Sequence, residues 1–140
     1  MAAKVLEVLG GVGVFAIEMF LTKEGNVIVN EIAPRVHNSG HHTIEAFDMS
    51  QFEAQIRCIT GMHLKDPKPT RKHAVMVNIL GEREGEANVK EIKPLVGAYM
   101  HIYGKIQVRK ERKMGHITVL GDDRKETEKR ALLARRSIEI

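Results

Sequence analysis

Residues 14–35 read VFAIEMFLTKEGNVIVNEIAPR, and this stretch decides the fold of the first half of the chain. β-Branched, aromatic and other apolar residues dominate Val14–Leu21 and Val27–Ile32. Lys23–Asn26, between the two runs, contains the Gly and Asn that turns favour. Two short β-rich runs joined by such a turn predict a β-hairpin.

The predicted hairpin would bring two carboxylates together. A four-residue loop places Thr22 opposite Val27, and counting back along the ladder then places Glu18 opposite Glu31. Like charges directly opposite each other destabilise a sheet unless a divalent cation with oxygen ligands compensates for them. The pair therefore predicts a Mg²⁺ site. Two alternatives stay open: a solvated face carrying both glutamates, or a one-residue error in the loop that puts them on opposite faces.

The segment Pro34–His42 combines Pro, Asn, Ser and Gly with three histidines, and it fits neither a helical nor a strand period. We therefore expect a loop. Its side chains that can donate hydrogen bonds to an anion are Arg35, His37, Asn38 and His41. Zinc ligation by the two histidines is an alternative, although no cysteine pair completes such a site. A loop with surface histidines is the other alternative.

Three further features organise the first half of the chain. Met1–Leu9 has the apolar spacing of the tail of an amphipathic helix, so we expect the chain to begin in the middle of a larger fold. Ser50 and Glu53 form a capping-box pair ahead of a helical run that Gly61 ends. Asp66–Lys72, with two prolines, has the composition of a linker.

The second half combines strands with one long helix. His73–Leu80, Tyr99–Tyr103 and His116–Leu120 have strand composition, and Asp122–Arg136 predicts a helix with a strongly basic face. We expect an α+β fold.

Composition limits the class of protein. The chain has 140 residues, 43% of them apolar and 29% charged, which indicates one domain or two small lobes rather than a disordered chain. A single cysteine, Cys58, excludes an internal disulfide framework, and neither a signal peptide nor an apolar run of membrane length occurs. We expect a cytoplasmic protein without a membrane partner.

The chain has an excess of positive charge. Lys and Arg outnumber Asp and Glu by 22 to 18 and concentrate after residue 104. This local positive charge would attract a phosphate or a nucleic acid.

Two sets of motifs resemble the N5-carboxyaminoimidazole ribonucleotide synthetases, a family of ATP-grasp enzymes. The first set resembles the last part of the ATP-grasp domain and consists of Val14–Phe20, Val29–Arg35, His37–His41 and Thr43–Ala46. The second set resembles the C-terminal domain and consists of Met76–Gly81, Tyr103–Lys105 and Arg112–His116. The order of the motifs is that of the family, and the resemblance covers nearly the whole chain.

The resemblance implies a reaction. Members of the family use ATP and bicarbonate to make carboxyphosphate, and then carboxylate the amine of 5-aminoimidazole ribonucleotide in purine biosynthesis. It implies that Glu18 and Glu31 ligate Mg²⁺ or Mn²⁺ and, with Asn30, hold the phosphates of ATP. The residues that would hold bicarbonate or carboxyphosphate are Arg35, His37 and Asn38.

The resemblance also implies a substrate site. Lys105 and Arg112 match the positions that grip the 5′-phosphate of the ribonucleotide, with Asn38 and His41 as further substrate-binding residues. It gives no role to Lys113 or His116.

The expected organisation has two parts. Residues 1–65 would be the C-terminal lobe of an ATP-grasp domain, residues 66–72 a linker, and residues 73–140 a small antiparallel β domain with a terminal helix. The family resemblance implies a homodimer, with the N-terminal ATP-grasp lobe on another chain or otherwise absent, and a 140-residue chain that is inactive by itself.

Two other functions compete with this one. A formate-dependent glycinamide ribonucleotide transformylase would share the metal-binding glutamates, but the Asn38–His41 and Arg112–His116 motifs favour the carboxylating family. A basic module that binds RNA or a protein would use the cationic C-terminal part. Only four Phe and two Tyr are present and no nucleic-acid motif occurs, so we expect no nucleic-acid partner.

Overall fold

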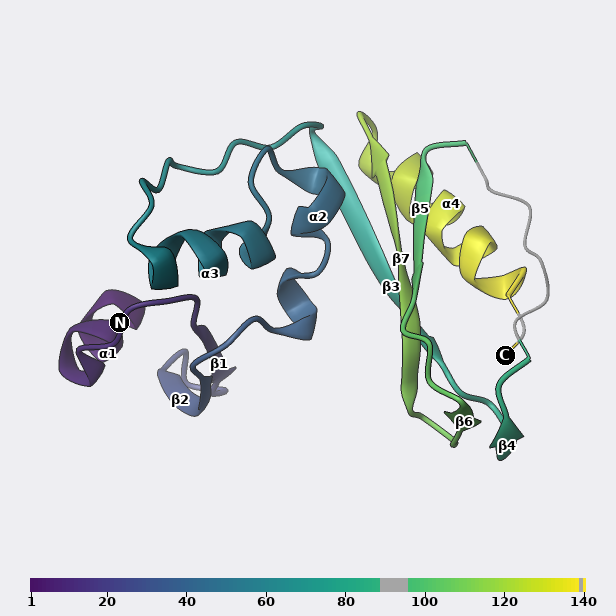
Figure 1. The fold of residues 1–140 in the computed structure, drawn as a ribbon, viewed down its shortest axis with the longest axis horizontal. Helices are drawn as coiled ribbons and strands as arrows, with labels where there is room; N and C mark the ends of the chain where they lie inside the picture. The colour runs from purple at the N-terminus through teal and green to yellow at the C-terminus, as the bar shows by residue number, and fades with distance from the viewer. Residues whose placement is uncertain (89–95, 139) are drawn as a thin grey trace. The chain divides into compact units, whose positions relative to one another are not determined.

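The computed structural model describes residues 1–88, 96–138 and 140, and it has two compact units. The first unit contains residues 1–44 and 49–68, and the second contains residues 45–48 and 69–140. Helices and antiparallel sheets are mixed as the α+β class predicts (Figure 1). In the described part of the chain, no helix is long and apolar enough to cross a membrane.

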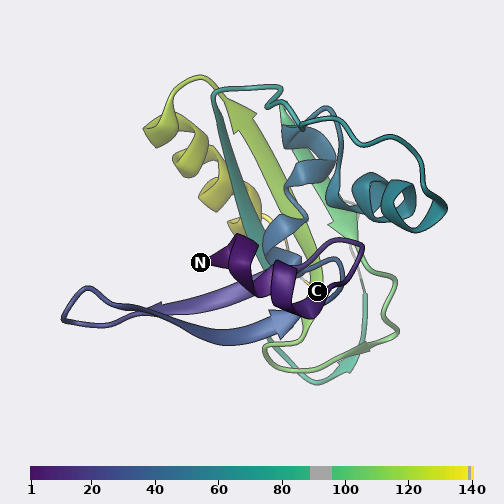
Figure 2. The same cartoon turned by 90° about the vertical axis from the view of Figure 1, so that its left-hand side faces the viewer.

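The first unit contains the predicted hairpin, formed by β1 (Ala16–Leu21) and β2 (Val27–Ala33). Figure 2 shows it as a twisted two-stranded ribbon. The prediction that Thr22 lies opposite Val27 is wrong, because Val27 pairs with Leu21. The Thr22 N–H donates to Asn26 O at 2.8 Å, so the loop between this closing pair has three residues instead of four.

A bulge compensates for the shorter loop. The register runs from Leu21↔Val27 to Met19↔Val29, and then shifts so that Glu18 lies opposite Glu31. Asn30 is the extra residue on β2, and a bulge of this kind restores the register that a one-residue change in the loop would have lost. The predicted pairing of the two glutamates is therefore confirmed. It results from a three-residue loop combined with a bulge, and not from the four-residue loop that the sequence predicts.

The helices of the first half follow their predicted signals. α1 spans Ala2–Leu9, and α3 spans Gln51–Thr60. The Ser50 hydroxyl accepts a hydrogen bond from the Glu53 N–H at 3.1 Å, and α3 ends at Gly61. The Glu53 carboxylate accepts from Arg57 one turn later, at 2.8 Å, so its side chain supports the helix as an i,i+4 pair.

The loop after β2 contains short helical turns that the sequence did not predict. Residues Asn38–Gly40 form the 3₁₀ turn η1, and Thr43–Ala46 form the one-turn helix α2. The remainder of the predicted loop is irregular.

The second unit is built on a three-stranded antiparallel sheet in the order β3-β7-β5. The strands span His73–Leu80 (β3), Ala98–Ile102 (β5) and Lys113–Gly121 (β7). A two-stranded sheet pairs β4 (Gly85–Glu86) with β6 (Gln107–Val108). The long strands agree with the prediction to within a few residues at their ends, whereas the two-residue strands were not predicted.

Helix α4 (Arg124–Arg136) covers one face of the three-stranded sheet (Figure 1). Asp123 caps it, since its carboxylate accepts from the Glu126 N–H at 2.8 Å. The buried core of this unit lies between helix and sheet and includes Ile79, Met114, Ile117, Val119 and Ala131. The described residues of the first unit, in contrast, include only three buried positions: Ala33, Met49 and Gln51.

Part of the predicted linker is attached to the second unit. The Thr70 N–H donates to Ala46 O and its hydroxyl to Glu45 O, each at 2.8 Å. Pro69 forms an isolated bridge with Phe47. The chain segment 45–48 is thereby fastened to the start of the second unit.

Candidate functional site: a carboxylate pair, an anion-donor loop and two cations

The Glu18–Glu31 pair is the acidic feature of the first unit. The two residues are direct partners in the ladder, and both are exposed, with about half of the Glu18 side chain accessible (49%). Carboxylate oxygens are the ligands that Mg²⁺ prefers, and Mg²⁺ usually keeps waters and phosphate oxygens in its other positions. Two accessible carboxylates on adjacent strands therefore fit a Mg²⁺ ion that carries a phosphate ligand. Asn30 lies beside them in the bulge and is exposed.

His37 connects the carboxylate pair to the loop. Its Nε2 lies 3.5 Å from Glu18 Oε1, and its Nδ1 lies 2.9 Å from Ser39 Oγ. The side chain is mostly buried (20% exposed) and also accepts from the Ser39 N–H at the start of η1. The structure thus brings two of the predicted site residues into contact.

A buried glutamine holds the loop in place. Gln51 is 8% exposed, and its Oε1 accepts from the His37 N–H at 3.0 Å while its Nε2 donates to His37 O at 2.8 Å. Gln51 Nε2 also lies 2.7 Å from His41 Nδ1, and the Gln51 N–H donates to Thr43 Oγ1. The sequence analysis did not identify Gln51; its position directly after the capping residue Ser50 was the available signal.

Gly40 allows this arrangement. A Cβ at residue 40 would lie 2.5 Å from Gln51 Oε1, so the glutamine occupies the space that a side chain would need. The Thr43 hydroxyl donates to Gly40 O at 2.6 Å, which fixes the same turn from its other side. The Asn-Ser-Gly turn is therefore shaped by contacts with α3.

The remaining loop residues differ in their surroundings. Arg35 is exposed and donates to Val36 O at 3.0 Å, so most of its guanidinium faces solvent. Asn38 begins η1 and is partly buried. His41 packs on Phe52 with ring centroids 5.3 Å apart and bonds to Gln51. No group of three or more His, Cys, Asp or Glu side chains that could hold a metal ion occurs among the described residues.

The two predicted phosphate-binding cations lie in the second unit, and each is held by a backbone carbonyl. Lys105 Nζ donates to Lys113 O at 2.6 Å, and Arg112 Nη1 donates to Gln107 O at 2.8 Å. Both side chains are partly buried. A guanidinium has five donors and an ammonium three, so both groups retain capacity for an anion.

The backbone of Arg112 is fixed by a close contact with the end of β3. The Gly81 N–H donates to Arg112 O at 2.8 Å, and the Glu111 N–H donates to Gly81 O at 2.9 Å. A Cβ at residue 81 would lie 2.3 Å from Arg109 O, so only glycine permits this approach. Glu111 has a positive φ of 62°, which is uncommon for a residue other than glycine.

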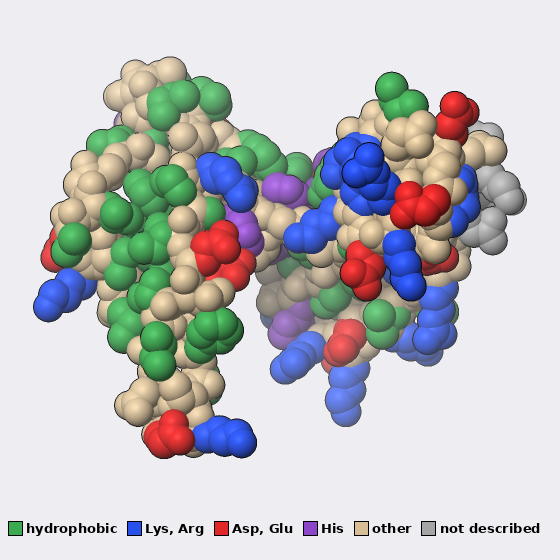
Figure 3. All heavy atoms as spheres, turned by 90° about the horizontal axis from the view of Figure 1, so that it is seen from below, with side chains coloured by type: hydrophobic (Ala, Val, Ile, Leu, Met, Phe, Trp, Pro, Cys, Tyr) green, Lys and Arg blue, Asp and Glu red, His purple; other side chains and the backbone are tan. Residues whose placement is uncertain are grey.

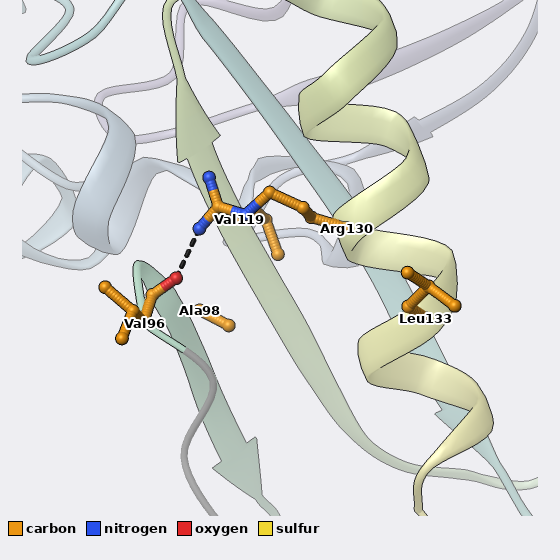
Figure 4. Close-up of a pocket in the computed structure, with 5 residues that line it drawn as sticks. All are labelled: Val96, Ala98, Val119, Arg130 and Leu133. Atoms are coloured by element: carbon orange, nitrogen blue, oxygen red, sulfur yellow. Dashed lines mark hydrogen bonds between the residues drawn. The ribbon is translucent and has the colours of Figure 1, made fainter.

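One cavity lies away from the predicted site residues. A cavity of about 310 Å³ is lined by Val96, Ala98, Val119, Arg130 and Leu133 (Figure 4). The Arg130 guanidinium donates to Val96 O and to Leu120 O, so two backbone carbonyls hold it in place. None of the predicted site residues lines this cavity.

Cationic side chains gather on the face of the second unit that Figure 3 shows. On α4, Lys125, Lys129 and Arg136 line a shallow hollow together with the half-exposed Leu132 and Leu133. None of the described residues that line the hollow is an aromatic on which a base could stack. The alternative of a nucleic-acid module gains no support from it.

One carboxyl group in the hairpin has a shifted pKa. The Thr22 hydroxyl, together with the backbone N–H of Glu24, lowers the pKa of Glu24 at the fully exposed turn. This group lies at the other end of the hairpin from Glu18 and Glu31.

Comparison with known proteins agrees with the motif sets. Residues 1–52 match the model of the ATP-grasp domain, and residues 74–130 match that of the phosphoribosylaminoimidazole carboxylase C-terminal domain. The chain is 45% identical over 130 residues to an N5-carboxyaminoimidazole ribonucleotide synthase of Staphylococcus epidermidis, covering 93% of this chain. The chain matches the C-terminal part of the N5-carboxyaminoimidazole ribonucleotide synthetases in sequence and in fold. These matches favour the carboxylating family over the alternative of a formate-dependent glycinamide ribonucleotide transformylase.

Other members of the synthetase family agree over the same part. The chain is 50% identical over 127 residues to the chloroplastic phosphoribosylaminoimidazole carboxylase of Vigna aconitifolia, covering 86% of this chain but 22% of that protein. It covers 34% of the Staphylococcus epidermidis protein. The chain thus spans about a quarter to a third of the length of these relatives.

Solved structures of synthetases have the same fold. The Thermotoga maritima enzyme superposes with a TM-score of 0.83 at 44% identity, over 99% of this chain and 40% of that one. The Aspergillus clavatus enzyme, in complex with ADP and 5-aminoimidazole ribonucleotide, superposes with a TM-score of 0.71 at 31% identity, over 95% of this chain and 38% of that one.

Proposed function

We propose that this chain contributes metal-, anion- and phosphate-binding residues to an N5-carboxyaminoimidazole ribonucleotide synthetase. The reaction is the ATP- and bicarbonate-dependent carboxylation of 5-aminoimidazole ribonucleotide through carboxyphosphate. The observation that carries the proposal is the Glu18–Glu31 pair, with His37 3.5 Å from Glu18. Two carboxylates and adjacent anion donors are what a phosphoryl transfer from a metal-bound nucleotide requires.

Each group has a separate task in this proposal. Glu18 and Glu31 hold Mg²⁺ or Mn²⁺, and Asn30 contributes to the binding of the ATP phosphates. When bound, the metal would neutralise charge on the phosphoryl oxygens. Arg35, His37 and Asn38 hold bicarbonate and then carboxyphosphate, with donors that the Gln51 contacts keep in position. His41, which bonds to Gln51, helps to shape the substrate site.

The second unit binds the ribonucleotide. Lys105 and Arg112 grip the 5′-phosphate, because both are cations with unused donors on well-anchored side chains. The remaining two thirds of the length of the relatives would supply the rest of the ATP site, on the same or on another polypeptide. A homodimer and a cytoplasmic location complete the proposal.

The exposed apolar residues of the hairpin support the need for a further lobe. Phe20, Leu21, Val27 and Ile28 are 42–74% exposed, and they form adjacent pairs in the ladder. A two-stranded sheet of this kind is at best marginally stable alone. A further lobe packed on the hairpin would cover such a surface, whereas a chain without one would associate through it.

A binding titration tests the proposal. The chain is titrated with 5-aminoimidazole ribonucleotide and, separately, with Mg·ATP, as wild type and as the Lys105→Ala/Arg112→Ala variant. The matched control is Lys125→Ala/Arg136→Ala, which removes the same charge from α4. We expect ribonucleotide binding that the first variant loses and the control keeps, with little binding of Mg·ATP. Equal affinity in all three proteins would overturn the assignment of the phosphate site.

A further inference from the structure

The face of the three-stranded sheet that points away from α4 carries a row of polar side chains. Ile117 and Val119 belong to the core under α4, so their neighbours on β7, His116 and Thr118, point to the opposite face. His116 is 1% exposed and Thr118 fully buried. His116 pairs in register with Asn78 on β3 and with His101 on β5. A buried imidazole in this place is costly unless its hydrogen bonds are made.

Four side chains form a continuous series of contacts along this row. Glu45 Oε1 lies 2.6 Å from His101 Nε2. The rings of His101 and His116 stack with centroids 4.6 Å apart and planes 16° from parallel. His116 Nδ1 then lies 2.8 Å from the Tyr103 hydroxyl oxygen. All four side chains belong to the second unit.

The series ends at Lys105. Lys105 Nζ lies over the Tyr103 ring, 5.6 Å from its centroid, which is within the range of a cation–π interaction. The same ammonium donates to Lys113 O at 2.6 Å. The His116 contact fixes the tyrosine ring by its hydroxyl, and the ring in turn supports the lysine.

The other end of the series is anchored in the protein interior. The Glu45 side chain is 10% exposed, and its Oε2 has no hydrogen-bond partner among the residues that the structure describes. The backbone of Glu45 accepts from the Thr70 hydroxyl. A carboxylate that is buried to this extent has little freedom to change rotamer, so His101 is held firmly by its 2.6 Å contact.

We propose that Tyr103 and His116, anchored through His101 to Glu45, are positioning residues that hold the Lys105 ammonium where a phosphate monoester binds. The inference rests on the proposed role of Lys105 in the ribonucleotide site. A free lysine side chain loses rotamer freedom when it binds an anion. Holding Lys105 beforehand removes part of that cost and raises the affinity for the phosphate.

Removing the Tyr103 hydroxyl tests this directly. Tyr103→Phe keeps the ring but loses the bond to His116, and we expect the affinity for 5-aminoimidazole ribonucleotide to fall about fivefold, the effect of one hydrogen bond. Tyr99→Phe is the matched control, since it makes the same change on β5, which ends one residue before Tyr103, at a residue that is 45% exposed. Circular dichroism and thermal unfolding verify that both variants fold.

A double-mutant cycle separates a positioning role from a general structural one. If Tyr103 acts through Lys105, Tyr103→Phe has no further effect in a Lys105→Ala background. An equal loss in both backgrounds, or no loss in the single variant, would overturn the inference and leave the phosphate site intact. Two outcomes would overturn both proposals: an unchanged affinity for the ribonucleotide in Lys105→Ala, or no binding of the ribonucleotide by the wild type.

A second measurement tests the contacts without any ligand. Long-range proton–nitrogen NMR spectra report on the ring nitrogens of histidines. We expect the His116 signals to shift in Tyr103→Phe and to stay unchanged in Tyr99→Phe. Unchanged His116 signals in both variants would show that the hydroxyl contact is absent and would overturn the positioning role of Tyr103.

Discussion

Glu18 lies directly opposite Glu31 in the β1–β2 ladder, because a bulge at Asn30 shifts the register by one residue. Two carboxylates in this position repel each other, and the repulsion is relieved when a divalent cation binds between them. If the pair holds a metal as proposed, the stability of the hairpin would depend on the presence of that metal.

Neutralising one member of the pair should stabilise the hairpin in the absence of metal and weaken the binding of metal. Glu31→Gln is expected to raise the free energy of unfolding by about 0.2–1 kcal/mol in a chelator, because the like-charge repulsion is lost. It should also abolish the broadening of hairpin amide signals by Mn²⁺ in NMR spectra. Glu24→Gln, at the exposed turn of the same hairpin, should retain that broadening. Equal broadening in both variants would contradict the metal assignment.

Replacing the buried glutamine should loosen the loop. Gln51→Leu leaves the His37 N–H and C=O without their partners, and we expect a loss of about 2 kcal/mol in the free energy of unfolding. Gln55→Leu removes one bond, to the Val14 N–H, and should cost about 1 kcal/mol. Urea unfolding measures both. Faster hydrogen exchange at the His37 amide is expected for Gln51→Leu alone. An unchanged exchange rate in Gln51→Leu would show that Gln51 does not hold the loop in place.

A methyl group at Gly81 should displace the Arg112 turn. Gly81→Ala would put its Cβ 2.3 Å from a backbone oxygen, and we expect a loss of about 2 kcal/mol in stability and weaker ribonucleotide binding. Gly11→Ala is the control, because its Cβ would meet the far end of the Phe15 ring, which can move. Thermal unfolding and the binding titration measure the two effects. A fully stable Gly81→Ala variant would show that the turn can shift freely.

The shifted group at the hairpin turn gives a pH test. The hydrogen bond from Thr22 lowers the pKa of Glu24, so the bond is present above the ordinary carboxyl range and is lost as pH falls through the lowered pKa. Thr22→Val should raise the pKa of Glu24, and Thr22→Ser should keep it low. Carbon NMR titration of the Glu24 carboxyl follows the change. A low pKa in Thr22→Val would show that the backbone bond dominates.

The sequence predicts the elements whose signals are local. The hairpin, the Ser50 cap and the strand His73–Leu80 each depend on composition and spacing within a few residues, and the structure contains all three. Two-residue strands such as Gly85–Glu86 give no period to detect, and a bulge residue such as Asn30 has the same appearance as an ordinary strand residue.

The candidate site was less predictable, because its contacts join distant residues. Glu18 and Glu31 could be paired by counting along one hairpin, but the Gln51 bonds to His37 span 14 residues and depend on how α3 packs. The series from Glu45 to His101 spans 56 residues and depends on the second unit as a whole. Such contacts follow from tertiary packing, which spacing along the sequence does not reveal.

The bulge at Asn30 also separates the tip of the hairpin from its carboxylates. The pairs from Leu21↔Val27 to Met19↔Val29 lie between the turn at Lys23–Gly25 and the carboxylates, so side chains at the turn can be changed without altering the Glu18–Glu31 pairing as long as these pairs are kept. Glu24 at this tip is fully exposed, and Cys58 is the single native thiol of the chain. With Cys58 replaced, a cysteine introduced at residue 24 would carry a fluorescent label that reports on metal binding from outside the ladder.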